Sequence, residues 1–162
     1  MAISLDGFIA TKNDEVDWVL KSQWEGYRQT IKDCGCAIVG RRTYEMMPVE
    51  EFVPGCFFVV LTKSKNLKLK IEMSARVESP KQALKLLKQK GFDKACLVGG
   101  GGVNGSFYNQ DLIDEVMVDV EPVVLGNGIP LLAGAKKRVN LQLLEAKPLD
   151  DGGVRLRYRV KK

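Results

Sequence analysis

The sequence predicts an α/β protein with a mixed β-sheet, parallel in its first part, antiparallel in its C-terminal strands and flanked by helices on both faces. Three observations support this prediction. Strand-like and helix-like segments alternate over the first part of the chain. Phe57–Leu61 is a continuous apolar run, as expected of a parallel strand that is buried on both faces. Val154–Val160 instead alternates apolar residues with arginines, which indicates an antiparallel edge strand with one solvated face.

The elements of the first part follow from apolar spacing and turn residues. Apolar residues from Trp18 to Tyr27 recur at roughly helical spacing, and Pro80 suits the first turn of a helix. The expected strands are Ala2–Ser4 with Phe8–Ala10 (one strand interrupted at Asp6-Gly7), Ala37–Val39, Phe57–Leu61 and Ala95–Val98. The expected helices are Val16–Ile31, Thr43–Met47, one that begins at Pro80, and Val103–Tyr108.

The last part of the chain is expected to be mainly strand. The expected strands there are Glu115–Val120, Val123–Leu125, Asn140–Glu145 and Val154–Val160. The loops are short, and no internal repeat or linker-like segment is present. A chain of 162 residues is long enough for one domain with a substantial core, so residues 1–162 are expected to form a single domain.

Composition excludes several classes of function. The chain has no histidine, which removes Ser-His-Asp and Cys-His nucleophile pairs. The four cysteines do not have a usual zinc spacing, so no metal is expected. No apolar run approaches the roughly 20 residues needed to span a membrane. The first residues lack the positive region of a signal peptide, so a cytoplasmic location is expected.

The net charge of +5 favours an anionic small ligand over a nucleic acid. The lysines are scattered along the chain, and no aromatic residues are interleaved with them. Nucleic-acid surfaces commonly combine basic patches with aromatic residues, so no nucleic-acid partner is expected.

Four consecutive glycines, Gly99 to Gly102, are the most informative motif. They follow the strand-like Ala95–Val98 and precede a helix that begins near Val103. Residues without a Cβ weaken regular structure, but they let a ligand approach the backbone closely. Free N–H groups and the helix dipole at a helix N-terminus favour a phosphate. The motif therefore predicts a nucleotide pyrophosphate site, and a flexible turn is the alternative.

Two other strand ends carry residues that suit a phosphate. Gly40, Arg41, Arg42 and Thr43 follow one strand and begin a helix, so they offer guanidinium, hydroxyl and backbone N–H donors. A capping threonine with two solvated arginines would explain them equally well. Thr62-Lys63 follows the buried Phe57–Leu61 and suits the 2′-phosphate of NADPH, or is an ordinary polar turn.

The three segments are expected to lie on one rim, because ligands of mainly parallel sheets bind outside the carboxyl ends of the strands. A Rossmann domain is the competing interpretation, and Asp119 lies near its acidic offset. However, the glycines begin too late in the chain for the rest of that fold to follow.

These motifs, in this order, resemble the dihydrofolate reductase-like superfamily, and within it the riboflavin-biosynthesis reductase domain. The resemblance covers nearly the whole chain. The segments that carry it are Ser4–Ala10, Gly40–Glu45, Val59–Thr62, Val98–Gly101, Leu112–Glu115 and Pro122–Leu131. It implies a mixed sheet, NADPH as hydride donor and a homodimer. It also implies that the sequence begins inside the first strand.

The same resemblance implies roles for individual residues. Ala10 would lie near the nicotinamide, and Ser4 and Asp6 would face the substrate. The residues implied near the cofactor phosphates are Gly40, Arg41, Arg42, Thr43, Thr62, Lys63, Gly99, Gly100, Gly101, Gly102 and Val103. The proton for the reaction could come from Glu25, Asp6 or water.

The expected activity is NADPH-dependent hydride transfer to a C=N or C=O group of a heterocyclic small molecule. The resemblance favours the reaction of 5-amino-6-(5-phosphoribosylamino)uracil reductase, although Val98 stands where such enzymes usually have glutamate before the glycines. A dihydrofolate or pteridine reductase is the first alternative, and Cys56 replaces the arginine that folate reductases carry after Pro54-Gly55. A nucleotide-binding protein without catalysis is the alternative from another class.

Overall fold

Four parallel strands form the central sheet of the molecule, in the order β5-β4-β3-β6. They are β3 (Cys36–Gly40), β4 (Phe57–Leu61), β5 (Ser74–Val77) and β6 (Cys96–Gly99). This computed structural model describes residues 1–162, with the backbone alone described at Ser22. The apolar run Phe57–Leu61 is a strand with the predicted bounds, and β5 is a strand that the sequence analysis did not identify.

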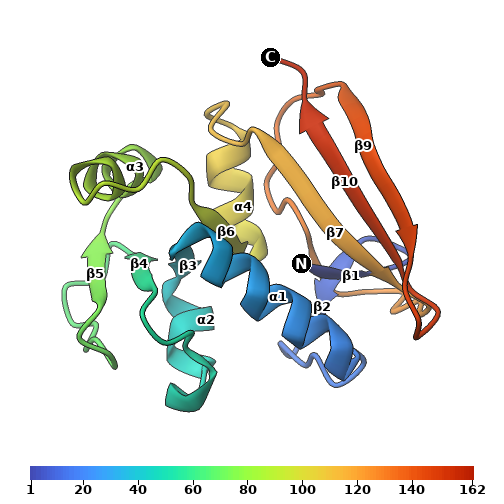
Figure 1. The fold of residues 1–162 in the computed structure, drawn as a ribbon, viewed down its shortest axis with the longest axis horizontal. Coiled ribbons are helices and arrows are strands. Elements are labelled where there is room, and N and C mark those ends of the chain that lie inside the picture. Colours follow the sequence, from blue (N-terminus) through green and yellow to red (C-terminus); the bar gives the residue numbers. More distant parts are fainter.

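A second sheet holds the antiparallel end of the fold, in the order β1-β7-β10-β9 (Figure 1). Its strands are β1 (Ala2–Ser4), β7 (Glu115–Glu121), β9 (Leu141–Pro148) and β10 (Val154–Val160). β1 runs parallel to β7, whereas β10 is antiparallel to both of its neighbours. The mixed architecture, parallel first and antiparallel at the C-terminus, is therefore confirmed.

The prediction that Val154–Val160 is an edge strand was wrong. β10 lies between β7 and β9, and β9 is the edge. The arginines that alternate along β10 pair with acids of β7: Arg155 Nε lies 2.7 Å from Asp119 Oδ1, and Arg157 Nη2 lies 2.6 Å from Glu115 Oε2. The polar face of the strand is thus matched by a charged neighbour, a feature that alternation alone does not distinguish from solvation.

The segment predicted as one interrupted strand is two strands in different sheets. After β1 the chain turns, with Gly7 N donating to Ser4 O, and β2 (Phe8–Ala10) pairs with β8 (Ile129–Pro130). The predicted strand 123–125 is absent. Its backbone instead meets the turn after β1, because Leu5 N donates to Val123 O.

The four α-helices are α1 (Lys21–Cys34), α2 (Arg41–Met46), α3 (Pro80–Gln89) and α4 (Gly101–Tyr108), and a 3₁₀ turn covers Val49–Glu51. The prediction of a helix over 16–31 was wrong at its start. Leu20 has extended backbone angles and acts as the N-cap, so Trp18 precedes the helix. α1 runs on to Gly35, which ends it in the left-handed conformation at φ 71°.

Helices cover both faces of the central sheet, as predicted, and each face has its own core. One core joins β3 and β4 to α1 and α2, with Tyr44, Phe52 and Phe58 at its centre. The other joins the opposite sheet face to α3 and α4 through Leu87 and Phe107. Among the described residues, none of these helices is long and apolar enough to cross a membrane.

Candidate functional site

The three phosphate-suited segments follow neighbouring strands of the central sheet. β4, β3 and β6 lie side by side and run in the same direction, with Gly40 paired with Leu61 and Val39 paired with Gly99. The segments that begin at Gly40, Thr62 and Gly99 therefore leave the sheet at the same edge. This edge, outside the carboxyl ends of parallel strands, is where α/β sheets bind ligands.

Two of these segments are in direct contact. A Cβ added at Gly40 would lie 2.8 Å from Val103 Cγ2 and 3.6 Å from the Gly99 carbonyl oxygen. A Cβ added at Gly100 would lie 3.5 Å from Thr43 Oγ1 and would otherwise meet only a methyl group, Ile9 Cδ1 at 3.9 Å. The start of α2 and the start of α4 thus form one continuous surface, with β2 beside it.

The four glycines have different roles, which corrects the interpretation that a ligand explains all of them. Gly99 has φ 89°, a conformation that other residues rarely adopt, and its peptide bond to Gly100 is cis. A Cβ at Gly101 would overlap the Pro130 carbonyl oxygen, so this glycine is required for packing. Gly102 faces open space, and a Cβ on Gly100 would make only ordinary van der Waals contacts.

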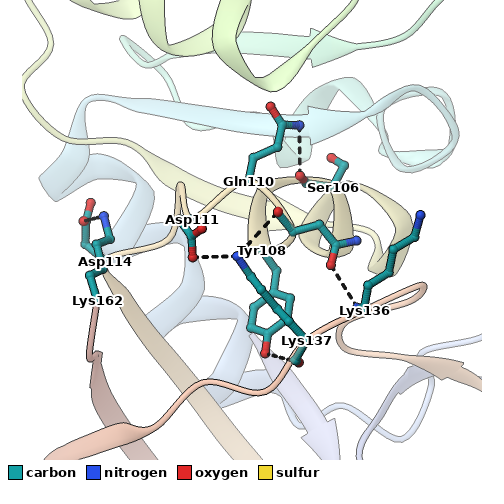
Figure 2. A network of polar contacts seen from close by, with 9 residues as sticks. Ser106, Tyr108, Gln110, Asp111, Asp114, Lys136, Lys137 and Lys162 are labelled. Carbon is teal, nitrogen blue, oxygen red and sulfur yellow. Dashed lines mark hydrogen bonds and ion pairs between the residues drawn. The ribbon is translucent and has the colours of Figure 1, made fainter.

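Polar contacts hold α4 against the segment that follows β8. Ala133 N donates to Gly101 O at 3.1 Å. Figure 2 shows the opposite end of the helix, where Tyr108 Oη donates to Lys137 O at 2.8 Å and Lys137 Nζ lies 2.6 Å from Asp111 Oδ1. The helix is therefore attached near both ends, which fixes the position of its N-terminus at the edge of the sheet.

The N-terminus of α4 is open to an anion. No side chain caps it, and Gly100 is the N-cap residue. The first N–H groups of a helix lack partners within the helix, and the helix dipole favours negative charge there. Such donors favour a phosphate group.

The basic side chains of the site are held by weak contacts. Arg41 pairs with Glu45 at 3.1 Å across one helical turn, and Arg42 pairs with Asp14. Their side chains are 50% and 65% exposed, and exposed pairs of this kind contribute little to stability. Both guanidinium groups can therefore turn toward a phosphate at small cost. Lys63 is exposed as well.

Side-chain hydrogen bonds of Ser4, at the end of β1, and of Asp6 hold the loop that follows β1. The buried Ser4 Oγ donates to Asp6 Oδ1 at 2.6 Å and accepts a bond from Phe8 N. The Asp6 carboxylate also accepts bonds from the backbone N–H groups of Leu125 and Gly126. The Ser4 hydrogen bond, together with these backbone bonds, holds the pKa of Asp6 below its usual value. Asp6 is thus a poor proton donor near neutral pH.

An aromatic pocket lies between α1 and the segment after α2. Trp24 and Tyr27 line it from α1, with their ring centroids 5.9 Å apart, and Met47 and Glu51 line it from the other side. Glu25, the predicted proton donor on this helix, is exposed and lines a separate surface hollow with Pro54. The structure therefore gives Glu25 no place in the aromatic pocket.

Ala10 follows Ile9, which lies next to Gly100, but its own side chain is buried. It is 7% exposed and pairs with Ile129 across β2 and β8. A Cβ on Gly128 would overlap the Ala10 carbonyl oxygen, so the backbone is tightly packed here.

A carboxylate that sequence reasoning missed lies at the end of β7. Glu121 is 1% exposed, and neither carboxylate oxygen has a hydrogen-bond partner among the described residues. Burial, and then the charges of Asp151 and Asp119, raise the pKa of Glu121 to about 7. The alternation of Val118 and Val120 with these acids was the available signal, since it places Asp119 and Glu121 on the same face of a strand.

The sequence matches the model of the RibD C-terminal domain family over residues 56–154. It is 30% identical over 165 residues to uncharacterized protein YwjB of Bacillus subtilis (strain 168), which covers 98% of this chain and 94% of that protein.

Solved structures share the fold at lower identity. RibD of Acinetobacter baumannii superposes with a TM-score of 0.81 at 20% identity. The Thermotoga maritima diaminohydroxyphosphoribosylaminopyrimidine deaminase/5-amino-6-(5-phosphoribosylamino)uracil reductase superposes with a TM-score of 0.77 at 16% identity. Each match covers 99% of this chain, but only 56% and 55% of those two chains, so this chain spans about half their length. The family match and the near-complete alignment with a 30% identical relative place this chain in the RibD C-terminal domain family.

Proposed function

We propose that this protein is an NADPH-dependent reductase that transfers hydride to a C=N or C=O group of a heterocyclic small molecule. Membership of the RibD C-terminal domain family supports this proposal. The substrate class that we favour is an aminopyrimidine such as 5-amino-6-(5-phosphoribosylamino)uracil, the compound in the name of the Thermotoga maritima reductase.

The observation that carries the proposal is the meeting of three phosphate-suited segments at one edge of the central sheet. The uncapped N-terminus of α4, Thr43 Oγ1 and the exposed guanidinium groups of Arg41 and Arg42 all lie there. Apart from its neighbours in the chain, no backbone atom lies within 4 Å of a Cβ built on Gly100, so a ligand could approach this residue, and a larger side chain would block that approach. These donors and this space fit the pyrophosphate of a dinucleotide, and the bound dihydronicotinamide would supply the hydride.

The chain's own residues would bind and orient the two reactants. α2 has six residues and is about 9 Å long, so it connects the phosphate-binding edge at Thr43 with the aromatic pocket at Met47. Trp24 and Tyr27 offer apolar walls for a planar ring. Holding the ring beside the cofactor would supply much of the rate through orientation.

Replacing Gly100 with valine is expected to weaken NADPH binding at least 100-fold. The Gly100 backbone, with φ −67° and ψ −166°, accepts a β-branched residue, but the new methyl groups would occupy the space assigned to the pyrophosphate. Quenching or enhancement of NADPH fluorescence measures the dissociation constant, and a thermal melt checks that the variant is folded. Gly100→Ala should have an intermediate effect. A folded Gly100→Val variant with wild-type affinity would show that the cofactor does not contact this backbone.

Lys63→Ala is expected to weaken NADPH binding about tenfold and to leave NADH binding unchanged. A charge-assisted bond to the 2′-phosphate contributes roughly 1.5–3 kcal/mol, of which the exposed position of Lys63 retains a part. Lys65→Ala is the matched control, because Lys65 is an exposed lysine of the same segment. Equal losses for NADPH and NADH, or equal losses in both variants, would contradict a 2′-phosphate contact at Lys63.

Turnover assays separate the substrate classes. NADPH oxidation with 5-amino-6-(5-phosphoribosylamino)uracil supports the favoured reaction, and oxidation with dihydrofolate supports the alternative. NADPH binding without turnover of either compound would favour the third possibility, a nucleotide-binding protein that lacks catalysis.

A further inference from the structure

Two hollows lie between α1 and the segment 47–54, and Arg28 lines both of them. The aromatic pocket has a volume of about 230 Å³, with Trp24 and Tyr27 on its α1 side. The second hollow has a volume of about 380 Å³ and is lined on the opposite side by Pro54, so it is called the Pro54 hollow. Because one side chain forms a wall of both, the two hollows are adjacent parts of one groove.

Helix geometry explains why Arg28 lies where the two hollows meet. Trp24, Arg28 and Lys32 are four residues apart on α1, so they follow one another along the same side of the helix. Each interval spans about 6 Å along the helix axis. Trp24 lines the aromatic pocket, Lys32 lines the Pro54 hollow, and Arg28 between them lines both. This spacing suits a ligand whose ring and charged group are one or two helical turns apart.

The positive charge of Arg28 is not neutralised by the described part of the fold. Its side chain is half-buried, and Nη1 donates to Glu50 O at 3.4 Å, a long distance for a hydrogen bond. No ion pair joins Arg28 or Lys32 to a described residue. Other arginines of the chain do pair with carboxylates, namely Arg41, Arg42, Arg155, Arg157 and Arg159. The Arg28 guanidinium can therefore turn toward an anion at small cost.

The acids of the groove direct an anion toward the Pro54 hollow. Glu51 lines the aromatic pocket without an ion pair to a described residue, so its carboxylate repels an anion there. The Pro54 hollow has Arg28 and Lys32 against one carboxylate, that of Glu25, which leaves the hollow positive. Lys32 lies in the last turn of α1, where the helix dipole also favours a cation, so Arg28 is the stronger indication of a ligand.

We propose that Arg28 binds an anionic group of the substrate, a phosphate or a carboxylate, in the Pro54 hollow, while the planar ring lies beside Trp24 and Tyr27. This inference rests on the proposed reductase function and names a residue that determines its specificity. Arginine suits this role because its planar fork donates two parallel hydrogen bonds to either group. The protein is thus selective for heterocycles that carry an acidic group over the same rings without one.

Isothermal titration calorimetry tests this selectivity. One pair of probes is 5-amino-6-(5-phosphoribosylamino)uracil and its form without phosphate, 5-amino-6-(ribosylamino)uracil. The other pair is dihydrofolate, which carries carboxylates, and 7,8-dihydrobiopterin, which carries none. Saturating NADP⁺ is present, because it fills the proposed phosphate-binding edge and has no hydride to transfer. Thermal melts check folding, and fluorescence measures NADPH affinity.

The variants are Arg28→Gln, Arg28→Lys and the matched control Arg138→Gln. Arg138 is an exposed arginine that lines neither hollow. Arg28→Lys keeps the positive charge and loses the planar fork.

We expect the wild type to bind the phosphorylated pyrimidine at least tenfold more tightly than its form without phosphate. Arg28→Gln should weaken binding of the phosphorylated compound about 30-fold and change binding of the other form less than about twofold, as loss of a charge-assisted contact predicts. Arg28→Lys should recover part of this loss, and Arg138→Gln should match the wild type. In turnover assays Arg28→Gln should raise KM and leave kcat unchanged, because the contact is made equally in the ground and transition states.

A selective loss for the phosphorylated pyrimidine identifies a phosphate as the bound group, and a selective loss for dihydrofolate identifies a carboxylate. Equal losses for ligands with and without the acidic group, or unfolding of both Arg28 variants, would show that Arg28 only joins α1 to Glu50. Either result, or binding of none of the four probes by the wild type, would overturn the role of Arg28 alone. A wild-type protein that does not bind NADPH would overturn the proposed function, and this inference with it.

Discussion

Gly105→Ala is expected to lower the free energy of unfolding by about 3 kcal/mol. A Cβ at this position would overlap the carbonyl oxygen of Ala133 and would lie 3.0 Å from its carbonyl carbon. Both are backbone atoms, so no side-chain rotation relieves the overlap. The segment after β8 is also attached to the far end of α4 through Tyr108 and Lys137, which limits its freedom to move away. Urea unfolding followed by circular dichroism measures the loss.

Gly102→Ala is the matched control for this prediction. Gly102 belongs to the same helix, but a Cβ there would face open space. Alanine is better than glycine inside a helix by roughly 0.5–1 kcal/mol, so this variant should be as stable as the wild type or slightly more stable. Equal stabilities of the two variants would show that α4 and the Ala133 segment are not closely packed in solution.

The second large effect is a loss of stability as pH rises, caused by Glu121. The folded-state pKa of about 7 lies above the usual value of 4.5, because of burial and the neighbouring acids Asp151 and Asp119. The folded protein therefore binds the Glu121 proton more tightly than the unfolded chain does. The stabilisation is fully present below pH 4.5 and is lost as pH rises through about 7. At 1.36 kcal/mol per pKa unit, the loss is about 3 kcal/mol.

Glu121→Gln should remove this pH dependence, since glutamine does not titrate. Above pH 7 the variant is expected to be more stable than the wild type. The control Glu78→Gln, which changes an exposed glutamate, should behave like the wild type. Urea unfolding midpoints at half-unit steps from pH 4.5 to 8 give the comparison. Parallel curves for wild type and Glu121→Gln would mean that Glu121 titrates normally and that its carboxylate is solvated.

Much of the fold could be predicted because local patterns and tertiary packing agree. The strands Phe57–Leu61 and Val154–Val160 have the predicted bounds, since a continuous apolar run and a regular alternation are both local signals of a strand. The shared location of the three phosphate-suited segments could also be predicted from the sequence. Each follows a strand, and parallel strands bring their carboxyl ends to one edge.

The errors arise where residues distant in sequence decide the local structure. The helix expected from Val16 begins at Lys21, although apolar spacing continues on both sides of that boundary. The expected strand 123–125 has its backbone bonded to the turn after β1, and Val154–Val160 is covered by β9 on its outer side. No window of adjacent residues contains this information.

The sequence by itself determined the α/β class and the residue types at the strand ends, because both depend on local periodicity and on the chemistry of single side chains. Only the tertiary structure decided which glycines leave space for a ligand, since Gly101 faces a carbonyl oxygen from a distant segment while Gly102 faces open space. It also decided that Glu121 is buried without a hydrogen-bond partner among the described residues. Burial and close approach are properties of pairs of distant residues, and only the folded chain brings those residues together.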